Sequence, residues 1–130
     1  MLKEVNRRVN ALCHQVVESH QGGWRVAIKD NMAVAGMPLT CASPRLRHLQ
    51  CFYDAHAVAL LKQAGAVIVG KSNMDEFGMG SHTLHSIHGP SRHPLDPARS
   101  IGGSCWRVCV RWPWAAIRGV RCAYPPAMEG

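Results

Sequence analysis

The segment Gly65-Ala-Val-Ile-Val-Gly-Lys-Ser72 decides the fold that we expect for this chain. Its apolar run, residues 66–69, is short and continuous, which is typical of a strand covered on both faces. The apolar residues just before it recur at helical spacing: Val58, Leu61 and Ala64. Asp54 is placed to cap the start of this predicted helix, and Gly65 suits its end. Because a helix leads directly into a buried strand, the segment predicts an α/β fold.

The same segment also satisfies the pattern G-x-x-x-x-G-K-[ST] of a phosphate-binding loop. That loop needs a strand before its first glycine, so that the amides between the two glycines can curl around a phosphate. Here the residues between Gly65 and Gly70 are themselves the predicted strand, and a helix precedes them. We therefore expect no nucleotide site at this position.

Further from this segment, the chain shows alternating helical and extended patterns. Apolar residues near the start recur every three or four positions and predict a helix that ends before Gly22: Leu2, Val5, Val9, Leu12 and Val16. Residues 24–28 are rich in apolar side chains and predict a short strand. Residues 73–78 predict another short helix, and the polar residues 80–103 predict a long loop. Long loops without regular structure are often functional.

Two groups of polar residues are candidates for chemistry. His82, His85 and His88 are spaced by three residues and offer imidazole ligands, but the glycines and proline around them favour a solvated loop over a metal site. Lys29 directly follows the strand at 24–28. A lysine that is shielded from water there can lose its proton near neutral pH and serve as a base, although a surface lysine is the ordinary alternative.

Composition limits the class of protein. The formal charge is +7, but Lys and Arg are scattered along the chain, which favours solvated surface charge over a nucleic-acid site. No apolar run approaches the roughly 20 residues of a membrane span, so no membrane partner is expected. The start matches neither a secretory signal nor an organelle presequence. Without such a signal, the six cysteines are expected to be free thiols.

Taken together, several ordered segments resemble the amidase signature family. They are Val26-Ala-Ile-Lys-Asp-Asn31, Thr40-Cys-Ala-Ser43, Tyr53-Asp-Ala55, residues 64–81, Gly89-Pro90, Pro94-x-Asp96 and Gly102-Gly-Ser104. The resemblance covers about residues 24–104, and a weaker similarity is present at Val9-Asn-Ala11. It implies the N-terminal part of the amidase-signature fold, a mixed central sheet flanked by helices, here truncated.

The resemblance also implies roles for four residues. The family uses a Ser–Ser–Lys triad, and the match places its lysine, the final proton acceptor, at Lys29. It places the bridging serine, typically on a cis peptide, at Ser104, while Met79 and Ser81 match a loop that lines the substrate pocket. The chain differs from the family in one respect. The family has its nucleophilic serine further along the chain, whereas this chain contains no serine after Ser104. We therefore expect no turnover by this chain itself.

The wording Asn73-Met-Asp-Glu-Phe77 is similar to the branch formed by the A subunits of glutamyl-tRNA(Gln) amidotransferases. That branch implies glutamine hydrolysis, whose ammonia converts Glu-tRNA(Gln) to Gln-tRNA(Gln). ATP and Mg would be used by a partner subunit, with no cofactor in this chain. The branch also implies other amidotransferase subunits as partners and a mitochondrial location, with a cytoplasmic one as the alternative. Two other functions stay open: a non-catalytic binding module of that complex, and a general amidase relative with Cys105 or Cys109 as nucleophile.

The last segment differs in composition. We expect residues 1–104 to form a partial amidase-signature domain and residues 105–130 to be an unrelated tail. The tail is rich in Trp, Cys and Arg, and its apolar residues follow no helical or strand period. Trp106 has the single codon TGG, and Arg107 can have a codon of the form CGN. If the reading frame starts one base later, these bases read GGC, which encodes glycine. We therefore expect the tail to be out-of-frame translation or retained intron.

Overall fold

The computed structural model describes residues 2–16, 24–102 and 114–116. Its elements in chain order are α1 (Leu2–Val9), β1 (Leu12–Gln15), β2 (Trp24–Lys29), η1 (Pro44–Leu46), α2 (His56–Gln63), β3 (Ala66–Ser72), η2 (Glu76–Gly78), β4 (Ser91–Arg92), β5 (Ser100–Ile101) and β6 (Trp114–Ala116). Of the predicted tail, only β6 belongs to the described part.

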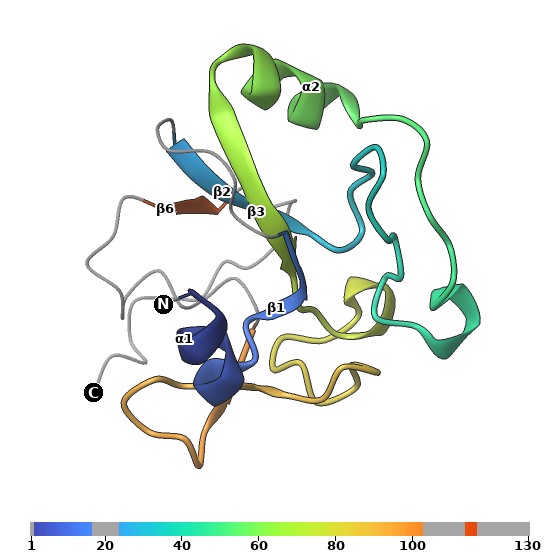
Figure 1. Ribbon diagram of the computed structural model, residues 1–130. Coiled ribbons are helices and arrows are strands. Elements are labelled where there is room, and N and C mark those ends of the chain that lie inside the picture. Colours follow the sequence, from blue (N-terminus) through green and yellow to red (C-terminus); the bar gives the residue numbers. More distant parts are fainter. Residues whose placement is uncertain (1, 17–23, 103–113, 117–130) are drawn as a thin grey trace.

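The main sheet is mixed and has the strand order β1-β3-β2-β6 (Figure 1). The central strands β2 and β3 run parallel, and β1 pairs antiparallel with the other side of β3. A parallel pair needs a long crossover, and here residues 30–65 supply it with α2 at its end. Both predicted strands are therefore confirmed, as is the α/β class.

Each face of this sheet carries its own apolar cluster, because successive side chains of a strand point to opposite faces. On one face, Val26 and Ile28 of β2 pack with Val58 of α2, and all three are fully buried. On the other face, Ala27 and Val69 pack with Val9 of α1. Burying one such side chain stabilises the fold by roughly 1.5–3 kcal/mol. One apolar cluster thus includes a residue of α2 and the other a residue of α1.

Strand β3 also decides the question of the phosphate-binding loop. It extends through Gly70 and Lys71 to Ser72 and pairs with β1 and β2 over that length. An added Cβ at Gly70 would overlap the carbonyl oxygen of His14 on β1. The glycine of the pattern thus permits a close strand contact, and its extended neighbours cannot surround a phosphate.

The N-terminal helix is shorter than predicted. Helix α1 ends at Val9, and the expected continuation is instead the strand β1. Asn10 adopts a left-handed φ of 49°, and the side chain of Asn6 bonds both the N–H and the carbonyl of Leu12. The apolar periodicity of the segment fits both structures locally, and pairing with β3 decides in favour of the strand.

Two further local predictions were wrong. Asp54 does not cap α2; its carboxylate accepts hydrogen bonds from the amide of Ala35 and the ammonium of Lys62, and no side chain caps that helix. Residues 73–78 do not form a helix but only the short turn η2. The predicted loop at 80–103 is confirmed as mostly irregular over its described part, residues 80–102, which includes the hairpin of β4 and β5.

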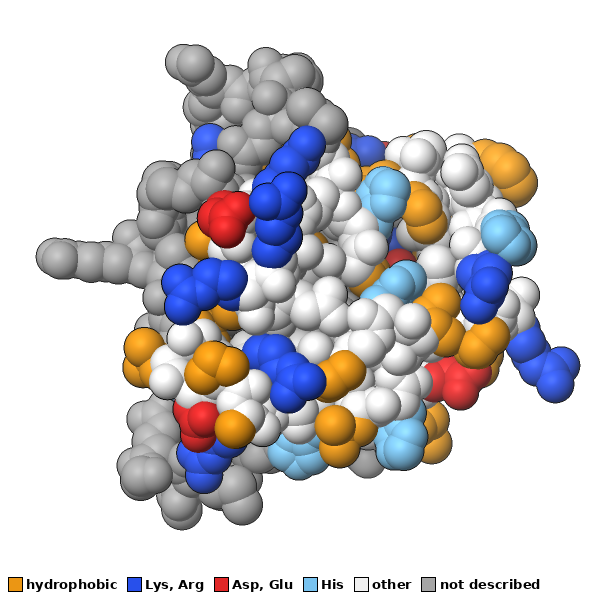
Figure 2. Space-filling view, turned by 60° about the horizontal axis from the view of Figure 1, so that its bottom comes forward, with side chains coloured by type: hydrophobic (Ala, Val, Ile, Leu, Met, Phe, Trp, Pro, Cys, Tyr) orange, Lys and Arg blue, Asp and Glu red, His pale blue; other side chains and the backbone are white. Residues whose placement is uncertain are grey.

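Charges are spread widely over the surface. On the face shown in Figure 2, Lys and Arg side chains lie among apolar and neutral ones rather than in one patch. Helix α1 places Arg7 and Arg8 in solvent, where Arg7 pairs with Glu4 at 3.2 Å. Within the described residues, no helix has the length and apolarity that a membrane span requires.

Candidate active site

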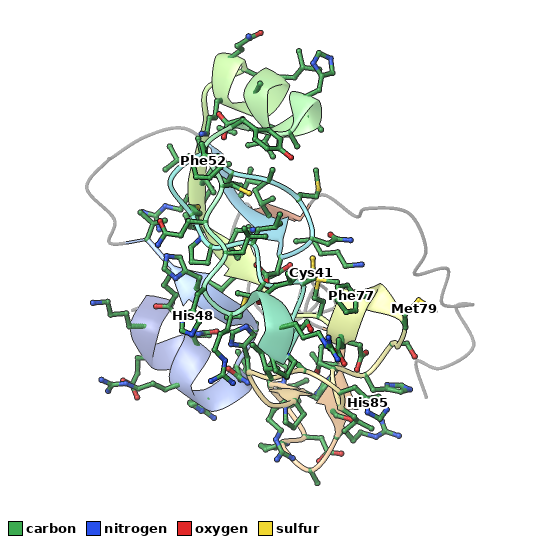
Figure 3. The ribbon with its side chains drawn as sticks, turned by 90° about the vertical axis from the view of Figure 1, so that its right-hand side faces the viewer. Cys41, His48, Phe52, Phe77, Met79 and His85 are labelled. Atoms are coloured by element: carbon green, nitrogen blue, oxygen red, sulfur yellow. The ribbon has the colours of Figure 1, made fainter. Side chains whose placement is uncertain are left out.

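Lys29 lies at the carboxyl end of β2, where strand pairing gives way to a turn. Its side chain is half-buried, and its carbonyl accepts a hydrogen bond from the amide of Met32 at 2.9 Å. A Cβ built on Gly78 would lie 3.8 Å from the Lys29 Nζ atom. The lysine amine is therefore next to η2, whose Phe77 is labelled in Figure 3.

The other predicted site residues are placed only in part. Met79 and Ser81 follow Gly78 closely in the chain, so they lie on the loop that begins beside Lys29. Met79 is 89% exposed, and its side chain extends away from the molecule in Figure 3. Ser104 lies outside the described residues. The roles of all four residues stay predictions.

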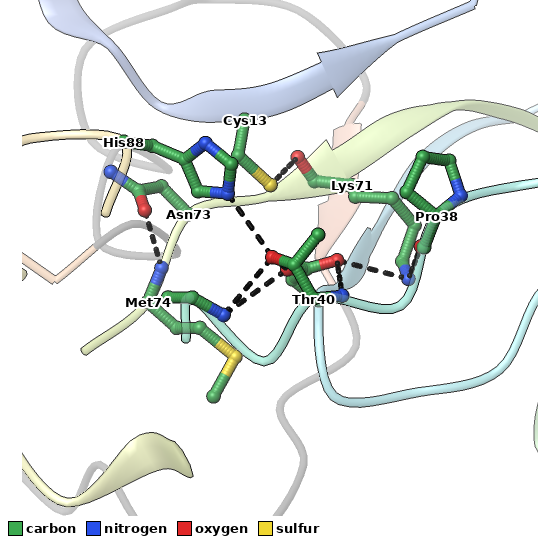
Figure 4. A network of polar contacts seen from close by, with 9 residues as sticks. Cys13, Pro38, Thr40, Lys71, Asn73, Met74 and His88 are labelled. Carbon is green, nitrogen blue, oxygen red and sulfur yellow. Dashed lines mark hydrogen bonds and ion pairs between the residues drawn. The ribbon is translucent and has the colours of Figure 1, made fainter. Parts of the chain in front are cut away.

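A second lysine, which the sequence singled out only as part of the phosphate-loop pattern, is completely buried. Lys71 on β3 pairs with Asp30 at 3.3 Å, and the two side chains are 0% and 1% exposed (Figure 4). The ammonium of Lys71 also donates to the carbonyl of Pro38 at 2.9 Å. Removing one partner of such a buried pair leaves an uncompensated charge, which costs far more than breaking a surface pair.

The carboxylate of Asp30 is the centre of this network. It accepts hydrogen bonds from the hydroxyl and amide of Thr40 and from the amide of Ala42, the last at 3.3 Å. Cys41 and Ala42 have left-handed φ angles of 48° and 54°. This conformation costs roughly 1–2 kcal/mol per non-glycine residue. Three hydrogen bonds to the buried carboxylate of Asp30 stabilise this turn and offset the cost of the left-handed conformation.

His88 and Cys13 complete the network. His88 Nε2 lies 3.1 Å from the hydroxyl of Thr40, whose proton goes to Asp30, so Nε2 must carry a proton and donate it. Burial lowers the pKa of His88, which favours the neutral ring at neutral pH. The Cys13 thiol donates to the carbonyl of Lys71 at 3.4 Å.

Cys13, Asp30 and His88 offer ligand atoms within 4.8 Å of one another. Their bonding nevertheless fits a cation poorly. The Lys71 ammonium already neutralises Asp30, Nε2 of His88 is a donor, and burial, helped by the charge of Asp30, raises the pKa of Cys13 to about 12. A metal ion is bound by a thiolate, a free imidazole nitrogen or a carboxylate that has no other counter-charge. In this arrangement the three side chains are engaged in hydrogen bonds and an ion pair with the protein itself.

The thiol of Cys13 is expected to resist alkylation in the folded chain. A pKa of about 12, against an ordinary 9.0, leaves about a thousandfold less thiolate near neutral pH, and the thiolate is the reactive form. Iodoacetamide labelling at pH 8, followed by mass spectrometry of the Cys13 peptide, should show this protection. In urea the same peptide should react at an ordinary rate, and rapid labelling without urea would contradict the buried geometry.

The motif at residues 73–77 organises the loop that follows it. Asn73 is 1% exposed and donates to the carbonyl of Gly89 at 2.8 Å. Asp75 accepts from the amides of Thr83 and His85 at 2.8 and 3.0 Å. These two side chains bind loop backbone, which explains why the predicted helix does not form. The loop bearing Met79 and Ser81 is therefore anchored on both sides.

Comparison with known proteins gives the family. The Amidase family model matches residues 20–105. The A subunit of the glutamyl-tRNA(Gln) amidotransferase of Methanospirillum hungatei is 56% identical over 82 residues, which are 63% of this chain and 19% of the relative. The mitochondrial A subunit of Mycosarcoma maydis is 49% identical over 86 residues, which are 66% of this chain and 16% of the relative. The chain thus spans about a fifth of the length of the curated relatives it matches.

Solved structures agree with this assignment. The crystal structure of the A subunit from Thermotoga maritima has a TM-score of 0.67 and 42% identity, and the match covers 73% of this chain and 22% of that one. 6-Aminohexanoate cyclic dimer hydrolase has a TM-score of 0.71 and 26% identity, covering 79% of this chain and 24% of that one. The segment matched by the family model contains β2, β3, Lys29 and most of the buried network. The chain belongs to the Amidase family.

Proposed function

We propose that this chain carries the lysine-bearing part of a glutamine-hydrolysing amidase subunit of a glutamyl-tRNA(Gln) amidotransferase. In this function Lys29 is the general base, Ser104 is the bridging serine, and Met79 and Ser81 line the pocket for glutamine. The observation that supports the proposal is the half-buried Lys29 at the end of β2, within the segment that the Amidase family model matches.

The proposed chemistry is acyl transfer. A serine hydroxyl attacks the side-chain amide carbon of glutamine, while its proton passes through Ser104 to the amine of Lys29. The proton then returns to the leaving nitrogen, ammonia departs, and water hydrolyses the acyl-serine to glutamate. The attacking serine has no counterpart after Ser104, because residues 105–130 contain no serine. We therefore propose that the 130 residues alone do not turn over glutamine.

The partners and location follow from the same proposal. The other subunits of the amidotransferase would receive the ammonia and use ATP and Mg to convert Glu-tRNA(Gln) to Gln-tRNA(Gln). The similarity to the mitochondrial proteins of Mycosarcoma maydis and Ajellomyces capsulatus supports a mitochondrial location, while the similarity to archaeal and bacterial ones leaves the cytoplasm as the alternative.

A chimeric protein tests the proposal. Residues 20–104 replace the matching segment of the Methanospirillum hungatei relative, and glutaminase activity is measured in the presence of that organism's other amidotransferase subunits. We expect activity within about tenfold of the parent, a barrier change of about 1.4 kcal/mol. The unmodified chain with the same subunits should show no activity. A folded, assembled chimera without glutaminase activity would refute the proposal, and co-purification of the inactive chain with the subunits would support the binding-module alternative.

A further inference from the structure

The buried ion pair meets the surroundings of Lys29 in two ways: Asp30 follows Lys29 in the chain, and both partners of the pair bond the segment 38–42. Lys71 and Asp30 form an ion pair with each other. Lys71 also donates to the carbonyl of Pro38, and Asp30 accepts from the amides of Thr40 and Ala42. The connection that reaches the end of the Lys29 side chain runs through residues 40–43, in which these bonds hold Cys41 and Ala42 at left-handed φ angles.

Residues 40–43 in turn hold the η2 turn. The carbonyl of Cys41 accepts a hydrogen bond from the amide of Phe77 at 2.9 Å. The Ser43 hydroxyl, itself fully buried, donates to the Glu76 carboxylate at 2.6 Å. Cys41 and Phe77 lie side by side in Figure 3. Two bonds thus fix η2 to the turn that Asp30 stabilises.

The η2 turn needs this support because its own backbone is unfavourable. Phe77 has φ 50° and ψ 16°, inside a turn of only three residues, and its side chain is 53% exposed. Little apolar burial therefore compensates for the left-handed conformation. The following residue, Gly78, is the one whose added Cβ would lie 3.8 Å from Lys29 Nζ. The η2 turn thus lies beside the Lys29 amine.

We propose that Lys71 and Asp30 are positioning residues for Lys29: their ion pair holds residues 40–43, and these residues hold the η2 turn against the Lys29 amine. This inference rests on the proposed role of Lys29 only for its functional meaning. The effect of the Lys71–Asp30 pair on the surroundings of Lys29 can be tested on the whole chain without measuring any activity. A negative result in this test is therefore distinguishable from a negative result for the glutaminase proposal.

The test uses Thr40, whose hydroxyl links Asp30 to the turn, because replacing it is milder than replacing a buried charge. The chain is reductively methylated with ¹³C-formaldehyde, and the signals of its dimethylated lysines are recorded by NMR. The variant Lys29→Arg identifies the signal of Lys29. We expect Thr40→Val and Lys71→Met to shift the Lys29 signal, and Thr40→Ser, which keeps the hydroxyl, to restore the wild-type position.

Asp54→Asn is the matched control, because it breaks an ion pair with Lys62 that lies on the surface. It should move the signal of Lys62 and leave that of Lys29 in place. Circular dichroism confirms that each variant is folded. The proposal is overturned if folded Thr40→Val leaves the Lys29 signal at its wild-type position, or if Thr40→Ser shifts it as far as Thr40→Val does.

Discussion

Replacing Lys71 by methionine is expected to lower the free energy of unfolding by about 3–5 kcal/mol, because it leaves the buried carboxylate of Asp30 without its counter-charge. Methionine is similar in length to lysine, so the loss reflects charge more than volume. Domains of this size are stable by about 5–15 kcal/mol, so the variant should be close to unfolding at room temperature. Urea denaturation followed by circular dichroism measures the change.

The surface ion pair of Lys62 and Asp54 shows how much less an exposed pair should contribute to the free energy of unfolding. Lys62→Met removes the ion pair with Asp54, whose 2.8 Å separation is shorter than that of the buried pair, yet the expected loss is about 0–1 kcal/mol because water screens it. The double variant Asp30→Asn with Lys71→Met removes both buried charges and should lose less than the sum of the single variants. Equal effects of Lys71→Met and Lys62→Met would show that the Asp30 carboxylate is not isolated from water.

Replacing Lys29 by methionine in the active chimera is expected to lower kcat at least about a thousandfold, since removing one member of a catalytic triad removes most covalent catalysis. Lys29→Arg should be as inactive, although it keeps the positive charge, because the guanidinium cannot give up its proton. Glutamate release from glutamine is the measurement. Lys29 is half-buried, so both variants should remain folded.

Two results would contradict a base role for Lys29. One is a Lys29→Arg chimera that retains activity, since it would show that charge alone suffices. The other is an equally large loss in Lys62→Met, which lies on the exposed side of α2 and serves as the control. A loss restricted to the two Lys29 variants supports the proposed proton acceptor.

The sheet could be predicted from sequence because its signals are local. The apolar run at 66–69 and the stretch at 24–28 each carry the pattern of a strand, and both are strands in the structure. The sequence assigns the segment 12–16 to a helix because three- and four-residue spacing fits it equally well. Only the partner strand β3, distant in sequence, decides that Leu12 and Gln15 belong to the sheet.

A site residue could be predicted from sequence where it directly follows a predicted strand. It could not be predicted where its role depends on a side chain or carbonyl that is distant in the sequence. Lys29 could be singled out from its place after residues 24–28. Lys71 could not, because its burial depends on Asp30 and Pro38, which come together with it only in the folded chain. The motif at 73–77 suggests a helix cap, whereas Asn73 and Asp75 bond loop backbone much further along. Hydrogen-bond partners of this kind leave no periodic pattern in a sequence.

The contacts around Asn10 set an order for folding. Its side-chain amide donates to the carbonyls of His88 and Gly89, and its carbonyl accepts from the Ser91 hydroxyl, at separations of 78 to 81 positions along the chain. Contacts between such distant positions form late, because closing a long loop costs entropy before any bond is gained. During synthesis on a ribosome, α1 leaves the exit tunnel long before its partner at 88–91 exists. The contacts of Asn10, just after the N-terminal helix, therefore form only when nearly the whole described fold has been made.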